Sequence, residues 1–159
     1  MYFVRCDCSI EPFNPGGILA WAFVVRRFKE LVHQDCGTSD RGKGATNNRG
    51  EYQAVIAALL WLVQQEDQSV PAIIMSDAQL IINQLNGIYR CNDPELIRLR
   101  DIALKAVKRY KGKITFKWIS RDKNQEADAL SRTAYDEEEL QFFRENKLDI
   151  LFEGDDIPF

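Results

Sequence analysis

The sequence predicts one α/β domain, a mixed β-sheet flanked by helices on both faces. Two observations lead to this fold class. Three β-rich segments come first, separated by short turns, and the rest of the chain alternates between helical and strand patterns. Hairpin strands followed by alternating helices and strands give a sheet with both antiparallel and parallel pairs. With 159 residues, 45% of them hydrophobic, the chain can bury one core without disulfides or a structural metal.

The three N-terminal strands are expected to form a meander. The first is predicted at Tyr2–Ser9 and the second at Ile18–Phe28, after the turn-forming run Asn14-Pro15-Gly16-Gly17. The third is predicted at Glu30–Cys36. Because the connections are short, consecutive strands should pair with each other.

The remaining elements follow from apolar periodicity and from start and stop signals. A long helix is predicted at Glu51–Gln65, with Asn47-Asn48 as its cap, because its apolar residues recur on one helical face. The continuous apolar run Pro71–Met75 is typical of a strand buried on both faces. The other predicted elements are helices Ala78–Leu85, Pro94–Tyr110, Gln125–Asp136 and Glu138–Asn146, strand Lys113–Ile119, and an extended acidic tail up to Phe159.

The charge is unevenly distributed along the chain, although the net charge is only -3. The segment Glu95–Lys123 has ten Lys or Arg against three acids, whereas Glu126–Phe159 has eleven acids against three bases. A basic segment followed by an acidic end is compatible with a phosphate-facing surface beside a separate acidic tail, and equally with solvated helix faces. The low net charge argues against nucleic-acid binding by bulk charge alone.

The cysteine spacing argues against a zinc-binding domain, and the short apolar runs argue against an integral membrane protein. Cys6, Cys8, Cys36 and Cys91 match no paired zinc spacing, so we expect free or buried thiols rather than a metal site with His33. The apolar runs are shorter than a bilayer-spanning helix needs, and the N-terminus has no signal-peptide pattern. A cytoplasmic monomer that does not contact a membrane is therefore expected.

Acidic residues stand where such a fold would gather them. Asp7 lies inside the first apolar strand, and Glu51 opens the long helix. Asp77 ends the buried strand, and Asp128 is in the first turn of a later helix. Each residue alone could be a cap or a first-turn acid. Together they indicate a metal site, because carboxylates in apolar settings are costly unless paired or bound to a cation, and oxygen ligands select Mg²⁺ or Mn²⁺.

Several short motifs are spaced along residues 1 to 136. They are Asp7-Cys8-Ser9, Asn14-Pro15-Gly16-Gly17, Thr46-Asn47-Asn48-Arg49-Gly50-Glu51, Ser76-Asp77-Ala78-Gln79, Trp118-Ile119-Ser120-Arg121 and Asn124-Gln125-Glu126-Ala127-Asp128-Ala129-Leu130. In this order they resemble the motifs of ribonuclease HI. The resemblance implies the ribonuclease H-like fold, with a five-stranded mixed sheet, and metal-dependent endonucleolytic cleavage of the RNA strand of RNA–DNA hybrids, as in primer and R-loop removal. It covers a ribonuclease H domain at 1–136, and residues 137–159 are expected to add a C-terminal helix and an acidic tail.

The resemblance also assigns roles to individual residues. Two Mg²⁺ or Mn²⁺ ions would be held by Asp7, Glu51, Asp77 and Asp128, in agreement with the chemistry of two-ion phosphodiester hydrolysis. The remaining positions implied to contact the hybrid are Asn14, Asn48 and Gln79 in its minor groove, with Thr46 or Asn47 at a DNA phosphate. Amides suit base edges and 2′-hydroxyls, although turn and cap chemistry would explain Asn14 and Asn47 equally well.

The sequence departs from the well-studied bacterial enzymes of this family. The loop before the last acid carries Arg121 in place of a histidine, as in the archaeal-type branch, and an arginine there can act only electrostatically. Cys8 replaces the usual glycine after the first aspartate. No basic protrusion stands between Leu85 and Asp93, so weaker hybrid affinity is expected.

The last residues, Asp155-Asp156-Ile157-Pro158-Phe159, resemble the acidic C-terminal tip of bacterial single-stranded-DNA-binding protein. The resemblance implies binding to proteins that recognise that tip, since an aromatic ring can fill an apolar pocket while acids meet a basic ridge. The alternatives are docking on a basic groove near Arg98–Lys117, a strand that folds back onto the domain, and a solubilising tail.

Two other functions remain open for the whole chain. The same fold serves DNA nucleases, and a non-catalytic module could bind hybrids or a protein partner. The Thr-Asn-Asn and Asp-x-Gln motifs favour a hybrid nuclease over a DNA nuclease. The four retained acids favour a hybrid nuclease over a non-catalytic binding module.

Overall fold

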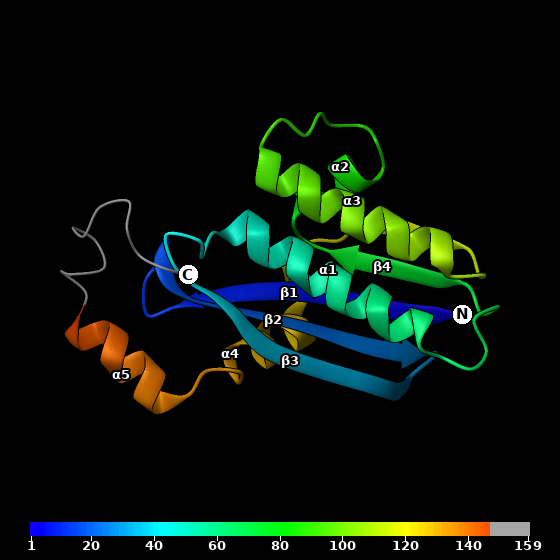
Figure 1. The fold of residues 1–159 in the computed structure, drawn as a ribbon. Coiled ribbons are helices and arrows are strands. Elements are labelled where there is room, and N and C mark those ends of the chain that lie inside the picture. Colours follow the sequence, from blue (N-terminus) through cyan, green and yellow to red (C-terminus); the bar gives the residue numbers. More distant parts are fainter. Residues whose placement is uncertain (147–159) are drawn as a thin grey trace.

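A five-stranded mixed sheet forms the centre of the molecule, in the strand order β3-β2-β1-β4-β5 (Figure 1). The computed structural model describes residues 1–146, and the expectations for residues 155–159 therefore lie outside the described part. Strands β1, β2 and β3 pair antiparallel, and β4 and β5 extend the sheet in parallel to β1. The predicted fold class and the predicted meander are confirmed.

The strands agree with the predicted segments but are in part longer. Strand β1 spans Tyr2–Glu11, β2 spans Gly16–Arg27 and β3 spans Glu30–Gly42. The extra residues of β3 are polar, and because β3 is the outer strand of the sheet they need no apolar alternation. Strands β4 (Ala72–Ser76) and β5 (Ile114–Trp118) match their predictions to within two residues.

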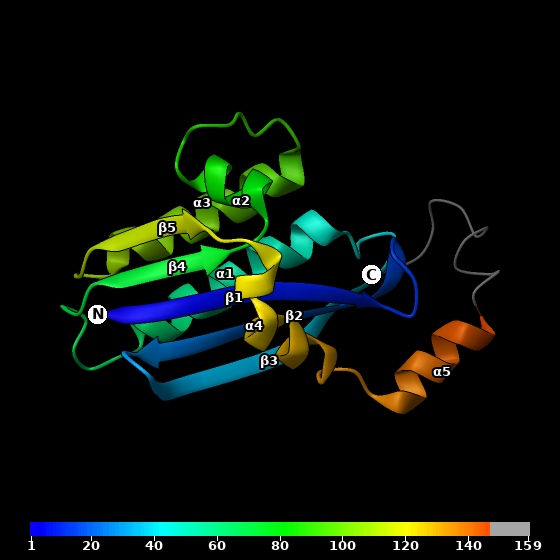
Figure 2. The ribbon, with the colours of Figure 1, turned by 180° about the vertical axis from the view of Figure 1, so that it is seen from behind.

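Helices cover both faces of the sheet, as Figures 1 and 2 show. Helices α1 (Asn47–Val63), α2 (Gln79–Leu85) and α3 (Pro94–Arg109) lie on one face, with α1 packed on β1 and β2 and α3 packed on α1. Helix α4 (Gln125–Arg132) packs on β1 and β2 from the other face. A short 3₁₀ turn, η1 (Arg121–Lys123), leads into α4.

The main core lies between the sheet and the layer of α1 and α3. Fully buried side chains on β1, β2, α1 and β4 fill it, among them Val4, Phe23, Leu59 and Ile74. Burying an aliphatic or aromatic side chain of this size contributes about 1.5–3 kcal/mol. This packing fixes α1 against β1, which matters because the site described below is shared between them.

Two helix boundaries differ from the predictions. Helix α1 begins at Asn47 rather than Glu51, and its N-cap is Thr46, which makes no side-chain capping bond; Asn47 and Asn48 are therefore not the cap. Helix α4 ends at Arg132 rather than Asp136. There the Thr133 hydroxyl donates to the Leu130 carbonyl, and such hydroxyls compete with the helical hydrogen bonds.

The last described helix, α5 (Glu137–Glu145), confirms the predicted added helix. Phe143 on this helix is buried and meets Phe13 of the β1–β2 turn edge to face, with ring centroids 6.5 Å apart. Glu139 pairs with Arg41 near the end of β3. These contacts attach α5 to the end of the sheet where β1 turns into β2. Within residues 1–146, no helix has the length and apolar character needed to cross a membrane.

Candidate active site

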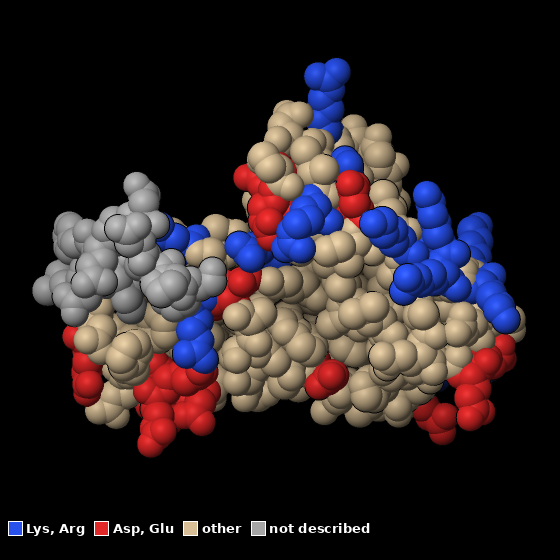
Figure 3. Space-filling model, in the orientation of Figure 1, with Lys and Arg blue, Asp and Glu red and all other residues tan. Residues whose placement is uncertain are grey.

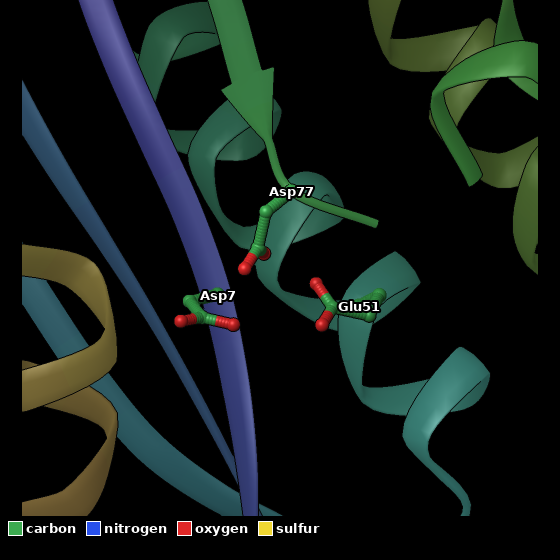
Figure 4. Close-up of side chains that lie close together, drawn as sticks. All are labelled: Asp7, Glu51 and Asp77. Carbon is green, nitrogen blue, oxygen red and sulfur yellow. The ribbon is translucent and has the colours of Figure 1, made fainter. Parts of the chain in front are cut away.

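Three carboxylates from three separate elements meet at one place. Asp7 is in β1, Glu51 is in α1, and Asp77 directly follows β4. Each offers an oxygen atom, and these oxygens lie within 4.8 Å of one another. Figure 4 shows the three side chains pointing toward a common space. We call these three residues the carboxylate cluster.

The register of the parallel strands explains why Asp7 and Asp77 meet. In the β1–β4 pairing, Arg5 lies opposite Met75, and β4 ends one residue later at Ser76. Continuing the register by two residues places Asp7 level with Asp77, just beyond the end of the paired segment. The edge of β1 is free of β4 there, so the side chains share the space at the end of the shorter strand. Packing of α1 on β1 brings Glu51 to the same level.

Burial and mutual repulsion strongly perturb the cluster. Only 6% of Asp7 and 4% of Glu51 are exposed. Burial, followed by repulsion from Asp77, raises the pKa of Asp7 to about 7. Burial, followed by the charges of Asp7 and Asp77, raises the pKa of Glu51 well above its usual value. Both shifts have the sign expected when carboxylates share a site without a counter-charge, which is the condition that a bound cation relieves.

The carboxylate pocket around this cluster contains the other two expected catalytic residues. Asp128 on α4 lines the pocket without belonging to the tight group of three, and it also forms an ion pair with Arg132 at 3.4 Å. Arg121, at the start of η1, brings a positive charge to the wall. The residues that line the pocket are Asp7, Cys8, Asn47, Glu51, Asp77, Ala78, Arg121 and Asp128.

The residues expected to contact a hybrid surround the pocket to different degrees. Asn47 lines the carboxylate pocket itself, and Gln79 is exposed at the start of α2. Thr46 and Asn48 line a second, neighbouring pocket at the start of α1. Asn14 is exposed in the β1–β2 turn, which a hydrogen bond from the Gly16 amide to the Ala45 carbonyl holds against the loop before α1.

Three residues that support the cluster received no role from sequence reasoning. The buried Ser76 hydroxyl donates to Glu51 Oε2 at 3.3 Å. Trp118 Nε1 donates to the Asp77 carbonyl at 3.2 Å. The fully buried Asn124 donates through Nδ2 to the Cys6 carbonyl at 2.9 Å and to Asp77 Oδ1 at 3.3 Å. The sequence offered one signal for Ser76, which is a polar residue at the end of an apolar strand. It offered none for Asn124, because the residues that Asn124 contacts are too distant in sequence to be found by spacing.

The basic segment is divided between two places in the structure. Arg121 reaches the carboxylate pocket, whereas a group of exposed bases covers the opposite, C-terminal end of α3 (Figure 3). This α3 basic patch comprises Lys105, Lys108, Arg109, Lys111 and Lys113. Glu51 is near the start of α1 and the patch is near the end of α3, so the patch does not line the cluster.

Cys6 and His33 pack among apolar and aromatic side chains. All four thiols are free, and Cys6 and Cys8 are buried. The His33 ring stacks on Trp61 with centroids 5.1 Å apart and lies near Phe23. The prediction of free or buried thiols is confirmed.

The donor set of the cluster fits a hard divalent cation. Its members are carboxylate oxygens, which Mg²⁺ and Mn²⁺ prefer, and they come close enough to bind one cation together. Burial and mutual repulsion raise the pKa values of Asp7 and Glu51, and nearby hydrogen bonds and Arg121 offset these effects only in part. A cation bound to the cluster would supply that compensation.

The comparisons with known proteins agree with this fold and site. Residues 21–134 match the family described as "Reverse transcriptase-like". Ribonuclease HI of Halobacterium salinarum is 36% identical over 125 residues, which cover 78% of this chain and 59% of that protein. The bifunctional protein Rv2228c of Mycobacterium tuberculosis is 30% identical over 92 residues; the match covers 58% of this chain and only 24% of that longer protein.

Solved structures show the same architecture. The crystal structure of RNase H1 from Halobacterium salinarum superposes with a TM-score of 0.74 at 28% identity, and the alignment covers 84% of this chain and 96% of that one. LC11-RNase H1, crystallised in complex with an RNA/DNA hybrid, superposes with a TM-score of 0.76 at 23% identity, with the same coverage of both chains.

The sheet order, the helical layers and these superpositions together define a ribonuclease H-like domain. The match over residues 21–134 shows that the chain belongs to the reverse transcriptase-like family. The family relationship expected from the ordered sequence motifs is thereby confirmed.

Proposed function

We propose that this protein is a ribonuclease H, an endonuclease that hydrolyses the RNA strand of RNA–DNA hybrids with the help of divalent cations. The observation that carries the proposal is the carboxylate cluster, in which Asp7, Glu51 and Asp77 bring oxygens within 4.8 Å of one another at the end of a ribonuclease H sheet. The likeness to the ribonuclease HI of Halobacterium salinarum supports the choice of reaction.

The cluster and Asp128 would hold two Mg²⁺ or Mn²⁺ ions. When bound, the ions supply activation of the attacking water and stabilisation of the leaving 3′ oxygen. Asp7 lies within electrostatic reach of the other pocket residues: burial and the charges of Asp77 and Asp128 raise its pKa, and Arg121 lowers it. Asp128 lies outside the carboxylate cluster but lines the same pocket, so it would help to hold the ions from one side of the pocket.

Arg121 would act on the phosphate rather than on a proton. The guanidinium stays charged at neutral pH, so it stabilises negative charge but cannot transfer protons. It stands on the wall of the carboxylate pocket in an exposed turn, where a scissile phosphate can approach it. Its charge would offset part of the repulsion between the four acids and the substrate.

The choice of a hybrid as substrate rests on the amides around the pocket. Asn48 and Gln79 beside the pocket, and Asn14 in the adjacent β1–β2 turn, present groups that donate and accept hydrogen bonds, and such groups can recognise base edges and the 2′-hydroxyls of an RNA strand in the minor groove. Thr46 or Asn47, at the start of α1, would hold a DNA phosphate. The neighbour LC11-RNase H1, whose structure contains an RNA/DNA hybrid, supports this substrate class.

The proposal is tested by comparing three duplexes of one sequence. A labelled RNA–DNA hybrid, an RNA duplex and a DNA duplex are incubated with the full chain in Mg²⁺, in Mn²⁺ and in excess chelator. Metal-dependent cleavage confined to the RNA strand of the hybrid supports a ribonuclease H. Cleavage of the DNA duplex would instead indicate a DNA nuclease of the same fold. Binding without any cleavage would indicate a non-catalytic module.

We further propose that residues Asp155, Asp156, Ile157, Pro158 and Phe159 bind proteins that recognise the tip of single-stranded-DNA-binding protein, so that a monomeric, cytoplasmic nuclease is recruited to hybrids. Deleting Phe159 should abolish that binding and leave cleavage of a free hybrid unchanged. A faster enzyme after the deletion would instead indicate that the tail restrains activity, for example on the α3 basic patch. No change in either assay would leave only a solubilising tail.

A further inference from the structure

Cys8 lies against the first turn of α1, which carries Glu51. The Cys8 side chain is buried and lines the carboxylate pocket. Its Sγ atom lies 3.4 Å from the Asn47 carbonyl oxygen and 3.5 Å from Asn47 Oδ1. In an α-helix the carbonyl of residue 47 also accepts the amide of residue 51, so Cys8 contacts the turn that sets the position of Glu51.

The Cys8 thiol also lies beside Glu51, since both side chains line the carboxylate pocket. A hydrogen bond from the thiol would favour the charged form of Glu51, as the hydrogen bond from Ser76 does. A thiol has one proton, so it serves either the Asn47 oxygens or Glu51 at a given moment. In each case the donor comes from β1 and the acceptor from α1, and the bond joins the two elements beside the cluster.

Gly50 provides the room that Cys8 occupies. A Cβ atom at position 50 would lie 2.8 Å from Cys8 Sγ, 2.9 Å from Cys8 Cβ and 2.5 Å from Leu19 Cδ1. Such contacts are too short for any side chain larger than glycine unless α1 moves or the Cys8 and Leu19 side chains shift. Cys8 and Gly50 are therefore a matched pair, and Gly50 is the residue immediately before Glu51.

We propose that Cys8 is a positioning residue for Glu51, which it holds in the metal-binding cluster by a thiol hydrogen bond and by close packing against Gly50. The inference rests on the metal-binding role of Glu51 in the proposed function. It does not require the thiol to touch a metal ion, and Cys8 is not one of the residues whose ligand atoms lie within 4.8 Å of one another.

The test measures Mn²⁺ affinity of the full chain, by the electron paramagnetic resonance signal of free Mn²⁺, beside the thermal unfolding midpoint without metal. Cys8→Ala should weaken Mn²⁺ binding roughly three- to tenfold, the range expected for one lost hydrogen bond. Cys8→Ser keeps a donor and should bind Mn²⁺ within about twofold of the original chain. Cys91→Ala, on a remote loop, is the matched cysteine control and should change nothing.

The packing half of the proposal is tested by a double-mutant cycle. Gly50→Ala should weaken Mn²⁺ binding in the original chain, and the loss should be smaller when Cys8 is replaced by glycine, because the Sγ and Cβ contacts are then gone and only the contact with Leu19 Cδ1 remains. Equal losses in both backgrounds would overturn the matched pair.

Unchanged Mn²⁺ affinity in Cys8→Ala, or an equal loss in Cys8→Ala and Cys8→Ser, would overturn the positioning role of the thiol. A lowered unfolding midpoint with unchanged affinity would assign Cys8 to packing alone and would also overturn it. The proposed function is judged separately, by hybrid cleavage. If the Mn²⁺ affinities change as expected but the chain cleaves no hybrid, the positioning role of Cys8 is upheld and the nuclease function is refuted. If the chain cleaves hybrids but the Mn²⁺ affinities do not change as expected, the nuclease function is upheld and the positioning role is refuted.

Discussion

Asn124 and Cys6 are joined by a hydrogen bond of 2.9 Å, from the Asn124 amide nitrogen to the Cys6 carbonyl oxygen. The bond lies just beyond the last β1–β4 pair, Arg5 and Met75, at the level where β4 ends. Asn124 stands between η1 and α4, so this one bond ties the elements that carry Arg121 and Asp128 to the strand that carries Asp7. Because Asn124 is fully buried, neither partner can turn to water instead.

Asn124→Ala should therefore lower the free energy of unfolding by about 1–3 kcal/mol, the cost of leaving a buried carbonyl without its donor. Urea unfolding followed by circular dichroism measures this change. Gln141→Ala, on the exposed side of α5, is the control and should stay within about 0.5 kcal/mol of the original chain. A loss as small as that of the control would show that the Asn124 bond does not stabilise the fold.

Asp77→Asn should have opposite effects on activity and on stability without metal. Hybrid cleavage should fall at least about a hundredfold, because the metal site supplies several kcal/mol of transition-state stabilisation. The metal-free chain should gain roughly 1–2 kcal/mol, since one charge leaves a repulsive cluster. Activity is measured on a labelled hybrid and stability by urea unfolding in chelator. Glu66→Gln, an exposed acid, should change neither quantity.

The stability of the metal-free chain should depend on the protonation of Asp7. Burial and the nearby Asp77 charge raise the pKa of Asp7 from 3.8 to about 7, so between these values the folded chain holds a proton that the unfolded chain has released. The contribution of this proton is complete below pH 4 and is lost as the pH rises through 7.

Unfolding in chelator at pH 5 and pH 8 measures this contribution. Relative to Asp7→Asn, the original chain should be less stable to unfolding at pH 8 than at pH 5. Mg²⁺ in place of the chelator should restore the stability that is lost at pH 8. The same difference at both pH values would show that the Asp7 carboxyl does not titrate in this window.

Arg121→Ala should reduce the turnover of hybrid about tenfold and leave Mn²⁺ affinity nearly unchanged, because the proposed role is electrostatic and lies on the substrate side. Arg121→Lys keeps the charge and should recover part of the rate. Steady-state kinetics at saturating hybrid separates turnover from binding. A turnover equal to that of the original chain in Arg121→Ala would remove Arg121 from the mechanism.

The strands and helices could be predicted largely because their apolar patterns are strong. The continuous run at Pro71–Met75 marks an inner strand, and the periodicity after Glu51 marks a helix, since both patterns follow directly from burial. The first turn of α1 escaped prediction because Asn47, Asn48 and Gly50 are poor helix formers. Contacts with β1 hold this turn in place, and no local pattern encodes them.

The candidate site was predictable in its ligands but not in its supports. Asp7 and Asp77 each follow or interrupt an apolar strand, which is a conspicuous place for a charge. Asn124 and Trp118 look ordinary in sequence, because their partners lie in β1 and beyond β4. The tight grouping of Asp7, Glu51 and Asp77, with Asp128 at the wall, also depends on the register of β1 with β4, which the sequence alone does not specify.

The most direct measurement follows both strands of one RNA–DNA hybrid, each with its own label, during incubation with the full chain in Mg²⁺. The account predicts internal cuts in the RNA strand, an intact DNA strand, and loss of all cutting in excess chelator and in Asp7→Asn. Cleavage of the DNA strand, or cleavage of RNA that persists in chelator or in Asp7→Asn, would contradict it.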